Sequence, residues 1–485
     1  MIRSWNAACV LLALTGVTLT SCVDEQIVYR DRNLFEEPLA QAANFLGYTD
    51  EASKLTVCGN CHVEKQGDWI GTAHADAWAT LKANSHASAS CEGCHSVNEL
   101  GNHVTATAGY NGTGEARYHD VQCESCHGPG LTHVTNPLEV NAPLAPIDVG
   151  DLDVGCVECH TGTHHPFAEE WVLSAHGEGT THQAYRTRDG CKTCHGGEGA
   201  LAAWGVNTEY VEKGDNAPIA ITCSVCHDPH ANDNEGQLRF SVSTPEVEAN
   251  LCMKCHQRRA VPDLGTLGTT TSGPHAPQGP LLLGELGTIG WTPPNFDYDV
   301  EAIRGTHGSE RNTRLCATCH VNSYDVTDPD TGGHIFTVTG HRFLAIPCVD
   351  SNDLPTDDQS CGKTVNERNF ASCTSSGCHG DETAALSALL TAQTRIEDRV
   401  ADLNAMLALV PTTEFSTTDT RFTVAEGARF NAQLGEIESS AVHNPFLTEA
   451  LLIASMDAVS DTYGIPAPVD ARTANLAAIV ARYGN

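Results

Sequence analysis

The sequence predicts a mainly α-helical chain with much irregular coil, in which a region rich in cysteine and histidine precedes a C-terminal helical cap. Only 40% of the 485 residues are apolar and 6% aromatic, which is little for a chain that must build its own core. The 22 cysteines and 24 histidines are concentrated in one repeated motif. Beyond residue 380, apolar side chains recur at helical spacing.

The N-terminus has the features of a lipoprotein signal peptide spanning residues 1–21. Arg3 gives it a positive start, and the mostly apolar run from Ala7 to Thr20 is too short to span a bilayer. The run ends in Leu19-Thr20-Ser21-Cys22, which resembles a bacterial lipobox, so Cys22 is the expected lipidation site. A soluble secreted protein with an incidental Cys22 is the alternative. We expect residues 22–57 to form an N-terminal tether.

The net charge of −34, from 27 Lys plus Arg against 61 Asp plus Glu, argues against nucleic acid as a partner because the field repels polyanions. The same argument disfavours binding to an anionic lipid surface.

The repeated motif is Cys-x-x-Cys-His. For this composition chance predicts about 0.05 copies. The chain contains eight: Cys58/Cys61/His62, Cys91/Cys94/His95, Cys123/Cys126/His127, Cys156/Cys159/His160, Cys191/Cys194/His195, Cys223/Cys226/His227, Cys252/Cys255/His256 and Cys316/Cys319/His320. A ninth copy, Cys373/Cys378/His379, has two extra residues between its cysteines.

This spacing suits covalent haem attachment. Two thiols three residues apart reach the two vinyl groups of one haem, and the next histidine lies beneath the iron as its proximal ligand. Zinc ribbons and redox-active dithiols also use Cys-x-x-Cys, but neither needs a histidine after every second cysteine. The sequence therefore predicts about nine haem c groups, eight at minimum, in a multihaem domain over residues 58–380. The first seven motifs start 29 to 35 residues apart, which suggests a row of small units packed on their haems.

A second axial ligand is available for every iron. Fifteen histidines remain outside the nine motifs, whereas only Met253, Met406 and Met456 could serve as methionine ligands in the mature chain. Two histidines saturate an iron and suit it to electron transfer, whereas an open position marks a haem that binds substrate. The candidate distal ligands are His74, His133, His165, His176, His230, His275, His307, His341 and His443.

Several phrases resemble the multihaem cytochrome c superfamily, which includes hydroxylamine oxidoreductase, pentahaem nitrite reductase and octahaem tetrathionate reductase. They are Cys123-Glu-Ser-Cys-His-Gly-Pro-Gly130 followed by His133, two Trp-x4-His phrases, Gly273-Pro-His-Ala-Pro-Gln-Gly279 and Val442-His-Asn-Pro445. The resemblance implies helical and irregular structure, stacked haems and distal ligands recruited from elsewhere in the chain. It supports His74, His133, His176, His275, His307 and His443 as distal ligands. The chain lacks the Cys-x-x-Cys-Lys motif of the nitrite reductases.

The C-terminal region, residues 381–485, is expected to be helical over 384–410, 423–440, 446–463 and 470–483. It would cap the haem row, and His443 would tie the cap to an iron. Cys348 and Cys361 bound an acidic loop and are expected to form a disulfide in an oxidising envelope. Calcium binding by this loop is a weaker alternative to simple solvation.

These features favour a non-catalytic protein that conducts electrons across or at the outer cell envelope, towards external or periplasmic acceptors. The expected partners are redox proteins, such as other cytochromes or a porin-type conduit, and external acceptors. Val23 after Cys22 favours an outer-membrane lipoprotein, by resemblance, facing the periplasm or the cell surface. Two alternatives stay open: an oxidoreductase acting on a small nitrogen or sulfur compound at one five-coordinate haem, and a subunit of a conductive filament.

Overall fold

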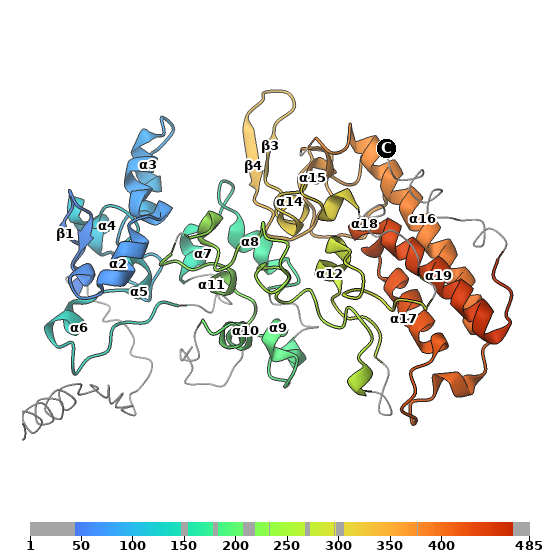
Figure 1. Cartoon of the computed structure of the whole chain (residues 1–485). Helices are drawn as coiled ribbons and strands as arrows, with labels where there is room; N and C mark the ends of the chain where they lie inside the picture. The colour runs from blue at the N-terminus through green and yellow to red at the C-terminus, as the bar shows by residue number, and fades with distance from the viewer. Residues whose placement is uncertain are drawn as a thin grey trace, which may run out of the picture.

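The computed structural model describes residues 44–146, 154–177, 183–206, 219–231, 233–266, 272–294, 296, 305–375 and 377–468. The chain crosses the molecule from a small N-terminal unit through short helices and coil to a bundle of long helices (Figure 1). The predicted class, mainly α with much irregular coil, is confirmed.

The N-terminal unit packs around short elements. They are β1 (Tyr48–Asp50), β2 (Leu55–Thr56), α2 (Val63–Trp69), α3 (Ala77–Ala83), α4 (Gly109–Thr113), α5 (Cys123–His127) and α6 (Leu131–Thr135). The buried Glu124 carboxylate accepts hydrogen bonds from the backbone N–H groups of Leu46 and Gly47, both at 2.8 Å. Phe45 is buried beside Tyr118. Folded structure therefore begins within the range expected for the tether.

The central part consists of short helices joined by coil. They are α7 (Cys156–Cys159), α8 (Phe167–Val172), α9 (Lys192–His195), α10 (Gly197–Ala203), α11 (Cys223–Cys226), α12 (Gln278–Leu283), α14 (Cys316–His320) and α15 (Ala371–Thr374). The first cysteine of a motif begins α7, α11 and α14, because the motif needs one helical turn and no more.

An antiparallel hairpin, β3 (Tyr324–Thr327) and β4 (His334–Val338), projects from the central part (Figure 1). Its base docks on the chain around α8. The Thr337 N–H donates to the Thr163 carbonyl at 2.9 Å. The buried Glu170 carboxylate accepts from the Thr339 N–H at 2.7 Å and from its hydroxyl at 2.8 Å. These contacts hold Thr337 of β4 against Thr163, which precedes α8, and hold Thr339, which follows β4, against Glu170 of α8.

The helical cap is formed by α16 (Glu382–Leu407), α17 (Val424–Glu436), α18 (Ser440–His443) and α19 (Pro445–Tyr463). Thr423 and Glu426 form a capping box at the start of α17, and the Asn444 side chain caps α19 just before Pro445. Three expected helices therefore exist, with the 423–440 range divided between α17 and α18. The helix expected over 470–483 lies outside the described residues.

Apolar packing differs sharply between the cap and the motif region. One large cluster joins α16, α17 and α19 around fully buried side chains such as Leu403, Leu434 and Leu451. Within the described part of the motif region, the clusters away from the cap are small, like those around Val157 and Val225. The motif region thus leaves room for another apolar component to act as its core. Among the described residues, no helix combines the length and apolar character that membrane crossing requires.

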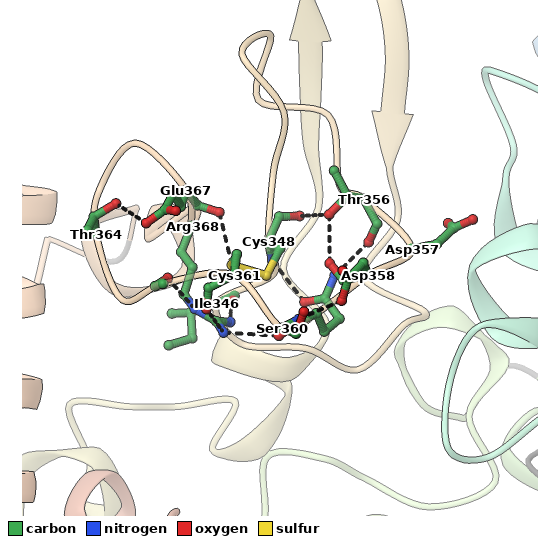
Figure 2. The surroundings of a disulfide bond; sticks show 12 residues. Ile346, Cys348, Thr356, Asp357, Asp358, Ser360, Cys361, Thr364, Glu367 and Arg368 are labelled. Carbon is green, nitrogen blue, oxygen red and sulfur yellow. Dashed lines mark hydrogen bonds between the residues drawn. A yellow bond between two sulfur atoms is a disulfide. The ribbon is translucent and has the colours of Figure 1, made fainter.

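Cys348 and Cys361 are joined by a disulfide with an S–S distance of 2.01 Å (Figure 2). Arg368 fills the loop that they close, because its guanidinium donates to the carbonyls of Ile346, Gln359 and Cys361 at 2.9 to 3.3 Å. This loop precedes α15 and so restrains the chain that carries the ninth motif.

Candidate haem-binding centres

Most of the motifs, numbered 1 to 9 in chain order, share one local geometry, whereas in motif 2 the His95 N–H donates to the Glu92 carbonyl at 3.2 Å. The histidine N–H of motif 1 donates to the carbonyl of the first cysteine at 3.0 Å, and motifs 4 to 7 repeat this contact at 2.8 to 3.1 Å. The turn places both thiols and the imidazole on one side of the backbone. In motif 9 the His379 N–H still reaches the Cys373 carbonyl, at 3.3 Å. The longer linker therefore does not separate the backbone of the histidine from that of its first cysteine.

The attachment cysteines differ in their exposure. Cys61, Cys156 and Cys378 are exposed, whereas the other motif cysteines are half-buried. Cys156 nevertheless has a neighbour, because its thiol lies close to that of Cys223. Haem attachment at all of these cysteines stays a prediction.

Eight motif histidines face a second histidine from a distant part of the chain. The ring centroids lie 6.1 to 6.3 Å apart in the pairs His62–His133, His160–His74, His127–His230, His256–His176, His195–His275, His227–His341, His379–His307 and His320–His443.

This separation tests whether an iron fits between the rings. Metal–nitrogen bonds of about 2.0 Å and imidazole bonds of about 1.33 Å place two ring centroids about 6.3 Å apart across one metal ion. Direct stacking would bring the rings closer, as it does for His119 and Trp78 at 3.9 Å. The spacing of the eight pairs fits an axially ligated haem iron.

The remaining motif histidine, His95, is approached by His165. Burial lowers the pKa of the His165 imidazole, and the neighbouring His95 lowers it further. With this pair, all nine candidate distal histidines lie near nine different motif histidines.

Backbone carbonyls orient many of these rings. The Nδ1 atoms of six of them lie 2.7 to 2.9 Å from a carbonyl oxygen: His95 with Ala77, His127 with Pro143, His133 with Val140, His227 with Gly236, His307 with Val442 and His320 with Phe343. Such a partner fixes the tautomer, so that Nε2 carries the free lone pair towards the metal.

Three of the paired imidazoles are held in the neutral form, which is the form that binds metal. Burial, reinforced by neighbouring histidines, lowers the pKa of His160 and His341 to about 4 and that of His443 to about 3. These rings are therefore uncharged at neutral pH.

His230 has a carboxylate partner. Its Nδ1 lies 3.4 Å from Asp228 Oδ1, and Arg239 Nη1 lies 3.0 Å from the other oxygen. The hydrogen bond from His230, together with the charge of Arg239, holds the pKa of the Asp228 carboxyl below its usual range. A carboxylate behind a ligating histidine raises its basicity. The adjacency of Asp228 to motif 6 was the only sequence signal for this role.

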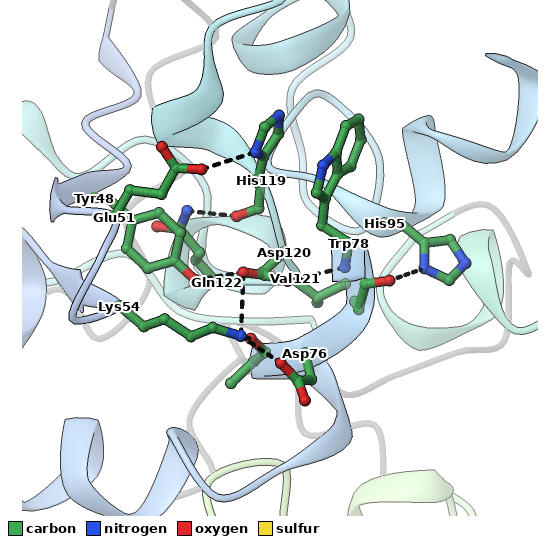
Figure 3. A network of polar contacts seen from close by, with 12 residues as sticks. Tyr48, Glu51, Lys54, Asp76, Trp78, His95, His119, Asp120, Val121 and Gln122 are labelled. Carbon is green, nitrogen blue, oxygen red and sulfur yellow. Dashed lines mark hydrogen bonds and ion pairs between the residues drawn. The ribbon is translucent and has the colours of Figure 1, made fainter. Parts of the chain in front are cut away.

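Some histidines outside these pairs have other contacts. His119 stacks on Trp78 and shares a hydrogen bond with Glu51 at 3.0 Å, within a polar network around Asp120 (Figure 3). His164 stacks on His334 at 4.5 Å. His182 lies outside the described residues.

The network of Figure 3 supports motif 2. The Asp120 carboxylate accepts hydrogen bonds from the Tyr48 hydroxyl at 2.8 Å and from the backbone N–H of Trp78 at 2.9 Å. The second bond fixes the start of α3. The Ala77 carbonyl in the same turn is the partner of His95 Nδ1.

Two family models match parts of the chain. Residues 216–261 match the doubled CXXCH motif, and residues 57–128 match cytochrome c554 and c-prime. Among solved structures, the chain resembles that of the outer cell wall cytochrome OcwA, with a TM-score of 0.52 and 16% sequence identity over 86% of this chain and 100% of that one. No curated protein matches the sequence.

The motifs, their geometry and these matches identify the chain as a multihaem c-type cytochrome that binds haem c.

The pairing of His443 with His320 can be tested by removing the distal ring. In His443→Ala we expect one iron to lose its sixth ligand and to become high-spin in electron paramagnetic resonance of the oxidised protein, while the haem content is unchanged. His86→Ala is the control, because His86 is exposed and contacts Asn84 through its backbone N–H. An unchanged low-spin spectrum in His443→Ala would show that another group ligates that iron.

The Asp228 contact predicts a change in one reduction potential. Asp228→Asn removes a charge that stabilises the oxidised iron through His230, so we expect the reduction potential of one haem to rise. The rise is about 59 mV for each tenfold decrease in the equilibrium constant that favours the oxidised over the reduced haem. Spectroelectrochemical titration measures this shift. Asp233→Asn is the matched control, since it removes the same charge from an exposed nearby side chain. Equal shifts in both variants would mean that only the overall charge matters.

Proposed function

We propose that the chain is a nine-haem electron-transfer protein that conducts electrons at the outer cell envelope of a bacterium. The observation that carries this proposal is the placement of a second histidine opposite eight of the nine motif histidines, with His165 near the ninth, His95. A haem held by each motif would supply a one-electron ferric/ferrous centre. Two imidazoles per iron leave little to rearrange when the electron arrives or leaves.

Contacts between motifs support transfer along the chain. The thiol of Cys58 lies close to that of Cys123, and the thiol of Cys156 lies close to that of Cys223. As thioethers, these sulfurs would hold the haems of the two motifs near each other. The cofactors then also provide the apolar interior that the small clusters of the motif region lack.

The proposed location rests on the N-terminal sequence. A signal peptide ending in Leu19-Thr20-Ser21-Cys22 supports lipid anchoring, and Val23 favours the outer membrane. The cysteine bridge between Cys348 and Cys361 suits an oxidising compartment. We propose other cytochromes, a porin-type conduit and external acceptors as partners. The acidic chain would favour partners with basic docking surfaces.

The haem content and spin states test the electron-transfer proposal against catalysis. We expect the purified protein to contain nine haems per chain by pyridine haemochrome assay and intact mass, with every ferric signal low-spin. Nitrite, hydroxylamine and sulfite should leave the spectrum unchanged. One high-spin haem that responds to such a compound would instead favour an oxidoreductase with a five-coordinate iron.

The anchor is tested separately by cell fractionation. In Cys22→Ala we expect the protein to move from the membrane to the soluble envelope fraction, because the acylated side chain is lost. Cys9→Ala is the control, since Cys9 lies within the signal peptide. Protease treatment of intact cells then distinguishes the cell surface from the periplasm. Membrane retention of Cys22→Ala would contradict lipid anchoring.

A further inference from the structure

Motifs 1 to 3 and motifs 4 to 6 are two copies of one structural unit. In each copy the first cysteine of the first motif contacts the first cysteine of the third, as Cys58–Cys123 and Cys156–Cys223. A tryptophan follows the first motif in both copies. Its indole N–H donates to the carbonyl two residues before the third motif, from Trp69 to Val121 at 3.0 Å and from Trp171 to Ile221 at 2.9 Å.

A third copy repeats the same contact with one motif fewer. Cys252 of motif 7 and Cys316 of motif 8, each the first cysteine of its motif, lie close together in the same way. The two cysteines are 64 residues apart in sequence, against 65 and 67 in the first two copies, so the length of the unit is kept. The sequence between Cys255 and Cys316 contains no cysteine, whereas motifs 2 and 5 occupy this interval in the other copies.

The joints between copies are also repeated. The second cysteine of a copy's last motif lies close enough to the first cysteine of the next copy to interact electrostatically, and this occurs three times: Cys126 with Cys156, Cys226 with Cys252 and Cys319 with Cys373. By this rule, motif 9 is the first motif of a fourth, truncated copy.

Distal histidines follow the same rule. The first motif of each later copy is faced by a histidine from the copy before it, in the pairs His160–His74, His256–His176 and His379–His307. The repeat therefore includes ligand exchange between successive units, and motif 9 obeys it as a first motif.

Motifs 2 and 5 contact the first motif of the next copy. Cys94 lies close to Cys159 of motif 4, and Cys194 lies close to Cys255 of motif 7. These contacts join second cysteines, whereas the contacts within a copy join first cysteines. Motifs 4 and 7 are thus junctions. The first cysteine of each contacts the last motif of its own copy, and the second cysteine contacts the middle motif of the copy before.

Two phenylalanines reinforce the line past these junctions. Phe167 contacts the rings of His160 and His341, which belong to motifs 4 and 6, at 5.4 and 4.8 Å. Phe343 contacts His341 and His176, of motifs 6 and 7, at 5.8 and 4.5 Å, and its carbonyl accepts from His320 of motif 8. Motifs 4, 6, 7 and 8 are therefore joined without motif 5.

We propose that motifs 1, 3, 4, 6, 7, 8 and 9 form the through line for electrons, and that motifs 2 and 5 are side positions joined at motifs 4 and 7. The inference rests on the proposed electron-transfer function. The third copy supplies the physical reason, because it keeps the contact between its first and last motifs without a middle motif. Motifs 2 and 5 then serve as lateral points at which single electrons leave or join the line.

The test compares variants that each lack one attachment motif. Cys91→Ser/Cys94→Ser removes motif 2, Cys191→Ser/Cys194→Ser removes motif 5, and Cys223→Ser/Cys226→Ser removes motif 6. Each carries His307→Ala, which makes the motif 9 iron high-spin and gives it a distinct absorption band as a reporter. Haem content and intact mass verify the loss of one haem per chain.

The protein is tethered to an electrode through its N-terminus, and reduction of the reporter is followed after a potential step. We expect the motif 2 and motif 5 variants to reduce the reporter within twofold of the parent rate, and the motif 6 variant at least tenfold more slowly. Equal slowing of reporter reduction in the motif 2, 5 and 6 variants would overturn the proposal that motifs 2 and 5 are side positions. An unchanged rate of reporter reduction in the variant without motif 6 would overturn it too. A parent that never reduces its reporter would contradict the electron-transfer proposal itself.

Distal-ligand variants keep all nine haems and so guard against misfolding. His165→Met and His275→Met raise the potentials at the side positions, whereas His341→Met raises that at motif 6. We expect only His341→Met to slow reduction of the reporter, by several-fold, because a carrier of altered potential matters only where every electron must pass. Comparable slowing by His165→Met would place motif 2 in the line.

Discussion

The interaction on which the rest of the structure depends is the facing of two imidazoles from distant parts of the chain, at a separation that admits one iron. Most such pairs tie a motif to another unit: His74 lies before motif 2 but faces motif 4, and His443 in the cap faces motif 8. Ligation therefore does what a continuous apolar core does in other proteins. The covalent motif fixes where each haem is attached, and the distal histidine fixes which units are neighbours.

This constraint explains the composition and the architecture together. A chain whose interior is provided by cofactors needs few large apolar residues and few long helices, and the motif region has small clusters and single-turn helices. The cap, which has only one distal ligand to offer, builds an ordinary packed interior from α16, α17 and α19. The surface can remain strongly acidic because electron transfer between saturated irons requires no anionic substrate.

Much of this could be predicted from the sequence. The attachment motifs are local and need only one turn of chain, so spacing alone located them, and helical periodicity located α16, α17 and α19. Counting histidines indicated that a second ligand was available, yet the partner of each depends on contacts between units and could not be read from sequence.

The single-motif period also concealed the longer unit, which became visible once Cys58–Cys123, Cys156–Cys223 and Cys252–Cys316 were seen as equivalent contacts. The carbonyl partners of Nδ1 have no sequence signature, and the role of Asp228 is signalled only by its place directly after motif 6. Anomalous diffraction from crystals of the purified protein at the iron absorption edge tests the central claim most directly. The account predicts nine iron positions, each between the two histidines of one pair, with seven following the line and two lying beside motifs 4 and 7. A histidine pair without iron, or an iron whose second ligand is not its paired histidine, would contradict it.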